Sequence, residues 1–236
     1  MASLSVASPN SPGTYEVFNM SLRLLVPCIT LASVLGGSGV FHVQPARAIV
    51  PGALCANPDK PDPIHVQLKP LADLLARGEG DYDSVNRGRA GDTPQGLTAL
   101  TGKDYSRTTV REIVSMQRSW IYAVGRYQFI PVTLRFAVAM STVSEEDYFT
   151  PEVQDRLMAA LILYKRPAIG AYLRGDHDYI GWALNELAKE WASVEYSNGR
   201  GFYDHVGGNR AHVSRTEAWE VLQGIKQGWQ SAGLLP

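Results

Sequence analysis

The sequence predicts a mainly helical domain with one small turn-rich segment. Apolar residues recur three and four positions apart in several stretches, which is the period of one buried helix face. Several of these stretches begin with a side chain that can cap a helix N-terminus. Between residues 81 and 107 the helical period is lost and glycine and proline gather, which favours loops or a small hairpin. We therefore expect helices to dominate, with little strand.

The first two expected helices flank the turn-rich segment. In the stretch 68–75 leucines recur at helical spacing, and Gly78 follows as a natural stop, so Glu79 would lie just past the end of this helix. The second begins with a capping box, in which Thr109 and the glutamate three positions later can each bond the other's backbone N–H. It should run to about Gln117.

Four more helices are expected towards the C-terminus, which makes six. A proline can start a helix over 131–139, and a Thr-Pro-Glu sequence is a strong start signal for another over 150–164. Apolar residues recur over 180–191, and Ser214 with Glu217 can cap a last helix. Four tryptophans fall on apolar helix faces and are expected in the core: Trp182, Trp191, Trp219 and Trp229.

Composition and charge place the chain among ordinary globular proteins. It has 236 residues, 45% hydrophobic and 19% charged, with a formal net charge of −1. The basic residues are scattered, so no field would gather nucleic acid, which we do not expect as a partner. One domain spanning 64–236 is expected, with residues 49–63 as a leader rich in proline, alanine and glycine. We expect it to be a monomer.

The first 48 residues resemble an N-terminal extension followed by a signal peptide. A short positive start at 21–23 precedes an apolar run over 24–41, and Ala46 and Ala48 fit the small-residue pattern of a signal peptidase site. Cleavage after Ala48 would export the mature chain to the periplasm or the exterior. The alternative is a membrane anchor, but Pro27 and a glycine-rich break leave the run poorly helical, so we expect no stable membrane insertion. Translation could start at Met1 or Met20.

Glu79 is the first candidate catalytic residue. Breaking a glycosidic bond requires a proton for the leaving oxygen, from an acid that stays protonated near neutral pH. A carboxylate beside the negative end of a helix dipole, partly sheltered from water, has a raised pKa. On this feature alone, a solvated surface glutamate remains the more common case.

Two sequence segments strengthen the case for Glu79. They are Gly78-Glu79-Gly80-Asp81-Tyr82-Asp83-Ser84-Val85-Asn86 and Ala123-Val124-Gly125-Arg126-Tyr127-Gln128-Phe129-Ile130-Pro131. The pair resembles the lysozyme-like superfamily, and within it the phage-lambda-type endolysins and muramidases, which cut peptidoglycan. The stretches 149–155, 168–176 and 190–193 are similar in kind and order to that family. The resemblance covers most of the chain from residue 68 to 229.

The resemblance implies a fold, a substrate and roles for particular residues. The fold would be α+β lysozyme-like, with two lobes and a groove between them. The substrate would be the β-1,4 bond between N-acetylmuramic acid and N-acetylglucosamine in peptidoglycan glycan strands, cut without cofactor or metal. Glu79 would act as general acid and then as base, while Tyr127 and Gln128 would line the saccharide cleft. Tyr127 could equally be core, and Tyr82 and Asn86 could orient Glu79 or a sugar, or simply form turns. One of the four tryptophans expected in the core could instead edge the sugar cleft.

The reaction type depends on a second carboxylate. Hydrolases need one at a set distance from the acid, and Asp81, Asp83, Asp92 and Asp104 are candidates by their proximity in the sequence. Lambda-type enzymes are implied to manage without it, because the muramic 6-hydroxyl attacks and leaves a 1,6-anhydro sugar. We lean to this lytic transglycosylase route over hydrolysis. The longer segment between the two motifs departs from the lambda-type pattern.

Two other classes of function compete with this interpretation. A non-catalytic peptidoglycan-binding scaffold would keep the fold and the cleft, but an intact motif around Glu79 argues against it. A peptidase or amidase would need a zinc set or an activated Cys and His pair, and neither is visible. His177 lies in an Asp-His-Asp sequence that invites a metal, but a solvated turn is the better interpretation.

Overall fold

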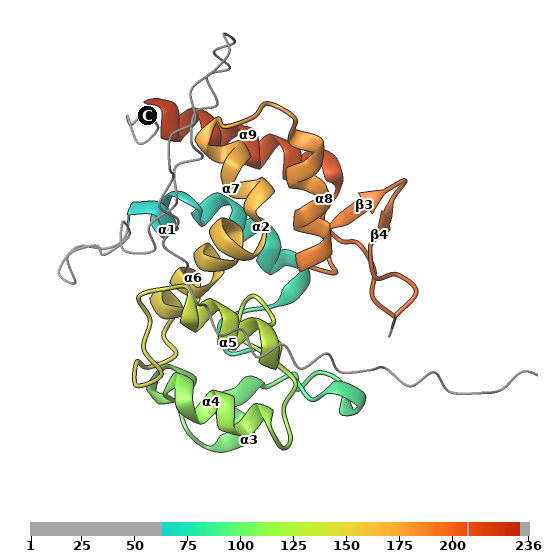
Figure 1. The fold of residues 1–236 in the computed structure, drawn as a ribbon. Helices are drawn as coiled ribbons and strands as arrows, with labels where there is room; N and C mark the ends of the chain where they lie inside the picture. Colours follow the sequence, from blue (N-terminus) through green and yellow to red (C-terminus); the bar gives the residue numbers. More distant parts are fainter. Residues whose placement is uncertain (1–62, 207, 232–236) are drawn as a thin grey trace, which may run out of the picture. The chain divides into compact units, whose positions relative to one another are not determined.

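A computed structural model describes residues 63–206 and 208–231 of the chain (Figure 1). In this part the chain is mainly helical, with nine α-helices and two small antiparallel sheets of two strands each. No helix in these two ranges is both long and apolar enough to cross a membrane. The expected signal peptide, its cleavage site and the leader up to residue 62 lie outside the described residues.

The elements follow one another along the chain with short connections. The helices are α1 Pro63–Gln67, α2 Lys69–Glu79, α3 Gly96–Thr101, α4 Val110–Gln117, α5 Pro131–Ala139, α6 Pro151–Ala160, α7 Pro167–Arg174, α8 Ile180–Glu190 and α9 Arg215–Ser231. The strands are β1 Val85–Asn86, β2 Ala123–Val124, β3 Glu195–Ser197 and β4 Arg200–Gly201. Single turns of 3-10 helix occur at Gly88–Ala90 and Tyr105–Arg107, and a π-helical turn, Leu161–Lys165, follows α6.

The six helices predicted from the sequence are present, and the three whose start carries a capping side chain, α4, α6 and α9, are capped as expected. The backbone N–H of Thr109 donates to Glu112 Oε2 at 2.7 Å, and Thr109 Oγ1 accepts from the backbone of Glu112 at 3.2 Å, which is the expected capping box. Ser214 and Glu217 form the same reciprocal pair before α9. The Thr150 hydroxyl caps α6. The local cap signals therefore predicted where these helices begin.

Three helices were missed, and each is short. α1 has five residues and α3 has six, too few for an apolar period to repeat. α3 also lies inside the segment predicted to be loops or a hairpin, so that prediction was wrong for Gly96–Thr101. α7 carried usable signals, because Pro167 stands at its first turn and Gly175 ends it in a left-handed conformation.

Both small sheets pair segments that the periodicity did not identify. β1 pairs with β2, which places Val85 opposite Val124 although most of the turn-rich segment and α4 separate them in the chain. β3 and β4 form a tight hairpin through Asn198 and Gly199, both with positive φ. An Asn-Gly pair is the strongest local signal for such a turn.

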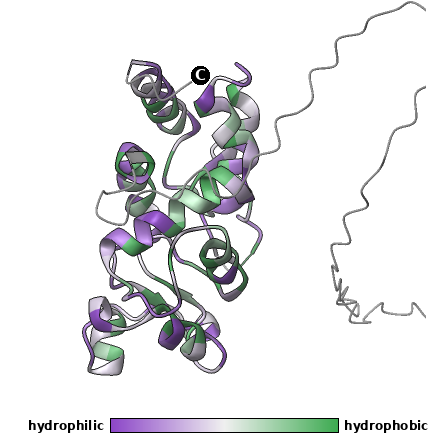
Figure 2. Ribbon diagram, turned by 60° about the vertical axis from the view of Figure 1, so that its left-hand side comes forward, coloured by the Kyte–Doolittle hydropathy of each residue, from purple (hydrophilic) through white to green (hydrophobic). Residues whose placement is uncertain are grey.

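The helices form two groups at opposite ends, with α2, α5 and α6 between them (Figure 1). α3 and α4 lie at one end, while α7 packs against both α8 and α9 at the other, and the β3–β4 hairpin projects beside α8. Buried apolar residues from helices at both ends form one core cluster. Figure 2 shows hydrophobic and hydrophilic positions mixed along the individual helices. Trp191 and Trp229 are buried as expected, but Trp182 and Trp219 are 58% and 39% exposed, so their prediction as core was wrong.

Candidate active site

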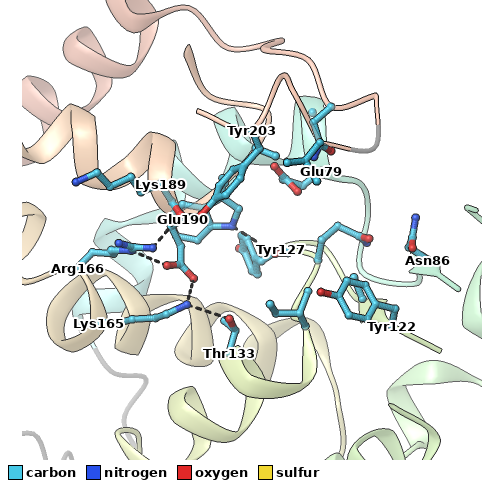
Figure 3. Close-up of a pocket in the computed structure, with 18 of the residues that line it drawn as sticks. Glu79, Asn86, Tyr122, Tyr127, Thr133, Lys165, Arg166, Lys189, Glu190 and Tyr203 are labelled. Atoms are coloured by element: carbon cyan, nitrogen blue, oxygen red, sulfur yellow. Dashed lines mark hydrogen bonds and ion pairs between the residues drawn. The ribbon is translucent and has the colours of Figure 1, made fainter. Parts of the chain in front are cut away.

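Glu79 lines a pocket of about 550 Å³, here called the Glu79 pocket. Its described wall comes from the end of α2, both strands of the β1–β2 sheet, the start of α5, the π-helical turn, the end of α8 and residues from the segments 191–206 and 208–209. Figure 3 shows Lys165, Arg166 and Glu190 on one side of it, with Asn86 and Tyr122 on the other and Glu79 between. Elements far apart in the chain therefore meet at this carboxylate.

Gly78 and Gly80, on either side of Glu79, stand where there is no room for a side chain. Gly78 is part of α2 and does not stop it, because α2 ends with Glu79, which corrects the expected helix end. A Cβ at Gly78 would lie 2.3 Å from the Cβ of Ser193. Gly80 has φ +144, and a Cβ there would lie 2.4 Å from the hydroxyl of Ser84. The Gly-Glu-Gly sequence thus lets the end of α2 pack against the side chains of Ser193 and Ser84, which a larger residue at either glycine would displace.

Burial raises the pKa of Glu79 above its usual value. The side chain is partly buried, and the hydroxyl and backbone N–H of Ser193 and the nearby His212 each act in the opposite direction. The backbone N–H of Ser193 donates to Glu79 Oε1 at 3.2 Å. The sequence argument expected a raised pKa from the helix end, and the shift has the expected direction, with loss of solvent as its main cause. A glutamate in this state can hold a proton for transfer.

Gln128 and Tyr127 both line the pocket, in different ways. Gln128 Nε2 donates to the carbonyl of Gly125 at 3.0 Å and would lie 3.9 Å from a Cβ on Gly80, so its amide lies beside the Glu79 segment. Tyr127 is 2% exposed, and its hydroxyl donates a short hydrogen bond to Asp155. The ring of Tyr127 therefore serves as core, leaving Gln128 as the polar group of this segment in the pocket wall.

Tyr82 belongs to a polar cluster next to the pocket and is not among the residues that line it. Its hydroxyl donates to both oxygens of Asp155 at 3.0 and 3.1 Å and accepts from Arg126 Nη1 at 2.7 Å. Arg126 also pairs with Asp73 on α2. The cluster of Tyr82, Asp155, Arg126, Asp73 and Tyr127 ties both motif segments to α2 and α6, so the contacts of Arg126 are structural.

Asn86 does lie in the pocket wall, paired with one of the candidate carboxylates. Asn86 Nδ2 donates to Asp92 Oδ1 at 2.6 Å, and Asn86 Oδ1 accepts from the backbone of Gly88. Asp92 is the one carboxylate of the four named from the sequence that is among the described lining residues. Asp81, Asp83 and Asp104 instead accept from backbone N–H groups in nearby turns and helix starts.

The sequence did not identify the charged group at the opposite side of the pocket. Glu190, whose side chain is 4% exposed, pairs with Lys165 Nζ and Arg166 Nε, both at 2.7 Å. Lys165 also donates to Thr133 Oγ1 at 2.9 Å. The sequence does contain an adjacent Lys-Arg pair after α6 and a glutamate at the end of α8. These residues indicate an ion-paired group only when it is known that the ends of the two helices lie together.

The sequence pattern predicts that His177 lies in a solvated turn, and the structure contradicts this. It is partly buried, with its ring 6.2 Å from that of Tyr172 and 5.5 Å from that of Trp182, and neither ring nitrogen has a hydrogen-bond partner. Within residues 63–206 and 208–231, no three His, Cys, Asp or Glu side chains gather in a way that could hold a metal ion. The aromatic neighbours, and not a metal, define the setting of this histidine.

Gly78→Ala should destabilise the protein and disturb the site, because its Cβ would collide with Ser193, whose N–H contacts Glu79. We expect a loss of about 1–3 kcal/mol in the free energy of unfolding, as for an overpacked core. Chemical denaturation measures it. Gly224→Ala on α9 is the matched control, because nothing lies within 4 Å of its Cβ and alanine favours a helix. Equal stability of the two variants would contradict the close contact.

Glu79→Gln should stabilise the protein at neutral pH and not in acid. The pKa of Glu79 is raised on folding, so the stability from this group is complete below the unfolded value of about 4.5 and is lost as pH rises through the folded value. Glutamine removes the cost of burying a charge. We expect a melting temperature a few degrees higher at about pH 7 and no difference at about pH 4. A variant less stable than wild type at neutral pH would contradict the raised pKa.

The chain was compared with protein-family models, with curated proteins and with solved structures, and none of the three comparisons gives a match. No family is therefore assigned from them. What the Glu79 pocket does must be inferred from its own residues and from the resemblance noted in the sequence.

Proposed function

We propose that this protein is a lysozyme-like glycosidase that cuts peptidoglycan glycan strands, with Glu79 as its general acid. The observation that carries the proposal is a glutamate with a raised pKa in the wall of an open pocket, at the position where the sequence motif expects the proton donor. The target would be the β-1,4 bond between N-acetylmuramic acid and N-acetylglucosamine. Glycoside cleavage needs an acid of this kind to protonate the leaving oxygen.

The composition of the pocket suits a polar chain such as a glycan. Tyr122 is 50% exposed in its wall and can pack a ring face on a sugar, while the amide of Gln128 can bond hydroxyl or acetamide groups. Lys165, Arg166 and Lys189 face two carboxylates, Glu186 and Glu190, so this side has an excess positive charge. Glycan strands with acidic peptide stems fit such a surface.

Transglycosylation is the route that the surrounding carboxylates support better. Glu79 would give its proton to the glycosidic oxygen as the bond to C1 breaks. The muramic 6-hydroxyl would then attack C1 and return its proton to Glu79, which leaves a 1,6-anhydro sugar. The other carboxylates in the described wall already have partners, since Asp92 accepts from Asn86 and Glu190 meets two cations. A hydrolase would need one of them to activate water or to support the sugar cation.

Three further expectations belong to this proposal. The two groups of helices at opposite ends of the described fold would belong to the two lobes of a lysozyme-like fold, with the Glu79 pocket in the groove between the lobes. The enzyme would be exported after cleavage near Ala48, to meet peptidoglycan in the periplasm or outside the cell. It would act as a monomer, without a cofactor or metal.

The products released from purified bacterial sacculi test the proposal. Wild-type protein should release 1,6-anhydro muropeptides, identified by mass spectrometry, and Glu79→Gln should lower the rate at least about 100-fold because it removes the transferable proton. Asp92→Asn should retain most of the activity, since it keeps the hydrogen-bonding shape without the charge.

Other product patterns would change the conclusion. Reducing muropeptides that disappear in Asp92→Asn would identify a hydrolase that uses Asp92. Release of the same products by Glu79→Gln would contradict the role of Glu79. Binding to sacculi without any products from wild-type protein would indicate the scaffold function instead.

A further inference from the structure

A smaller hollow of about 200 Å³ adjoins the Glu79 pocket. Its described wall is formed by Pro167 and Ala168 at the start of α7 and by Trp182, Asn185, Glu186 and Lys189 on α8. Lys189 lines both hollows, and Arg166, in the wall of the Glu79 pocket, pairs with Glu186 in the wall of the smaller one. The two hollows are therefore neighbours along one surface.

One face of α8 forms a track between them. Trp182, Asn185, Glu186 and Lys189 are spaced at i, i+3, i+4 and i+7, so they lie along one side of the helix. Seven residues of helix span about 10 Å. The track starts at an exposed aromatic ring and ends at the side of the Glu79 pocket where Glu190 pairs with Lys165 and Arg166. Extended polymers can occupy such a surface beyond the residues that react.

The ring of Trp182 is exposed and yet held in place. It is 58% exposed, although it packs edge-on against His177 at 5.5 Å and Tyr179 at 5.4 Å between ring centroids. His177 in turn contacts the ring of Tyr172. A ring fixed by neighbours loses little conformational freedom when a ligand covers it. The arrangement is a preformed flat apolar surface with polar groups beside it.

We propose that Trp182 and the adjoining hollow form an outer subsite for a sugar of the same glycan strand, beyond the sugars held at Glu79. This inference rests on the proposed function. The apolar face of a sugar ring would stack on Trp182, and the amide of Asn185 and the charged ends of Glu186 and Lys189 would bond its hydroxyl or acetamide groups. Continuity with the Glu79 pocket through Lys189 selects the glycan strand as the occupant.

The subsite makes binding depend on strand length. Short glycans that reach only the Glu79 pocket would not contact Trp182, whereas longer strands would cover both places. Each additional sugar on the track adds contact without changing the chemistry at Glu79. The protein should therefore prefer long strands, and this preference should depend on the tryptophan ring.

Binding of peptide-free glycan strands to full-length protein carrying Glu79→Gln, which does not consume its ligand, tests the subsite. Strands would be separated by length and titrated by calorimetry. Trp182→Ala in that background should weaken binding of long strands about 3- to 10-fold and leave disaccharide binding unchanged. Trp182→Phe, which keeps a ring, should restore much of the affinity. Trp219→Ala is the control, because this exposed tryptophan on α9 is not among the residues lining either hollow.

Three results would overturn the outer subsite. The first is the same affinity for long strands in Trp182→Ala and in the parent. The second is an equal loss for disaccharides and long strands. The third is self-association of the parent, measured by sedimentation and lost in Trp182→Ala, which would make this surface an interface between copies.

The two proposals fail in different ways. If sacculi yield Glu79-dependent products and long strands show no dependence on Trp182, only the outer subsite is wrong. If no glycan of any length binds and no products form, both the function and the subsite are wrong.

Discussion

The contact between the end of α2 and the backbone at Ser193 holds the candidate site together. The N–H of Ser193 donates to Glu79, and its carbonyl accepts from the N–H groups of His212 and Val213, at 2.7 and 2.9 Å. One peptide segment is thereby fixed between the acid and the chain that leads into α9. Gly78 permits this approach because it has no side chain. The burial that raises the pKa of Glu79 is a direct result of this close packing.

Two glutamates of the same pocket, Glu190 and Glu79, differ in the charged groups that surround them. Glu190 is almost fully buried but meets Lys165 and Arg166, so its negative charge is balanced within hydrogen-bond distance. Glu79 forms no ion pair among the described contacts and receives one backbone hydrogen bond at 3.2 Å. Burial that outweighs its hydrogen bond raises the pKa of Glu79. The pocket wall thus holds one glutamate inside an ion-paired network and one without an ion pair among the described contacts.

Local signals predicted the helices well because they act within a few residues. The capping boxes at Thr109 and Ser214 depend on neighbours three positions away, and both form as expected. Position 79 was singled out through its motif, because the helix end alone favoured a solvated surface glutamate. The partners of Glu79 could not be anticipated, because Ser193 lies 114 residues further along the chain and no local pattern predicts their contact. The ion pair between Lys165 and Glu190 could not be predicted for the same reason.

Some errors arose because one residue type serves several purposes. Gly78 was interpreted as a helix stop, whereas its small size is needed against Ser193 inside the last turn of α2. Trp182 was assigned to the core from its helical spacing, yet α8 turns that position outward beside Tyr179. Periodicity identifies a helix face but does not say which neighbour covers it.

Gln128 is held in a strained backbone conformation in the pocket wall. In the described residues it is one of two non-glycine residues with positive φ, at 47°, and the other is the hairpin Asn198. Asparagine tolerates the left-handed backbone conformation better than most residues, whereas glutamine does not. The backbone strain at Gln128 therefore costs roughly 1 kcal/mol. The turn is held by its neighbours, since Phe129 bonds back to Val124 and Tyr127 is anchored by Asp155. A glycine would fit the turn with less strain, so the side chain itself is what position 128 supplies, and its amide lies beside Glu79 in the pocket wall.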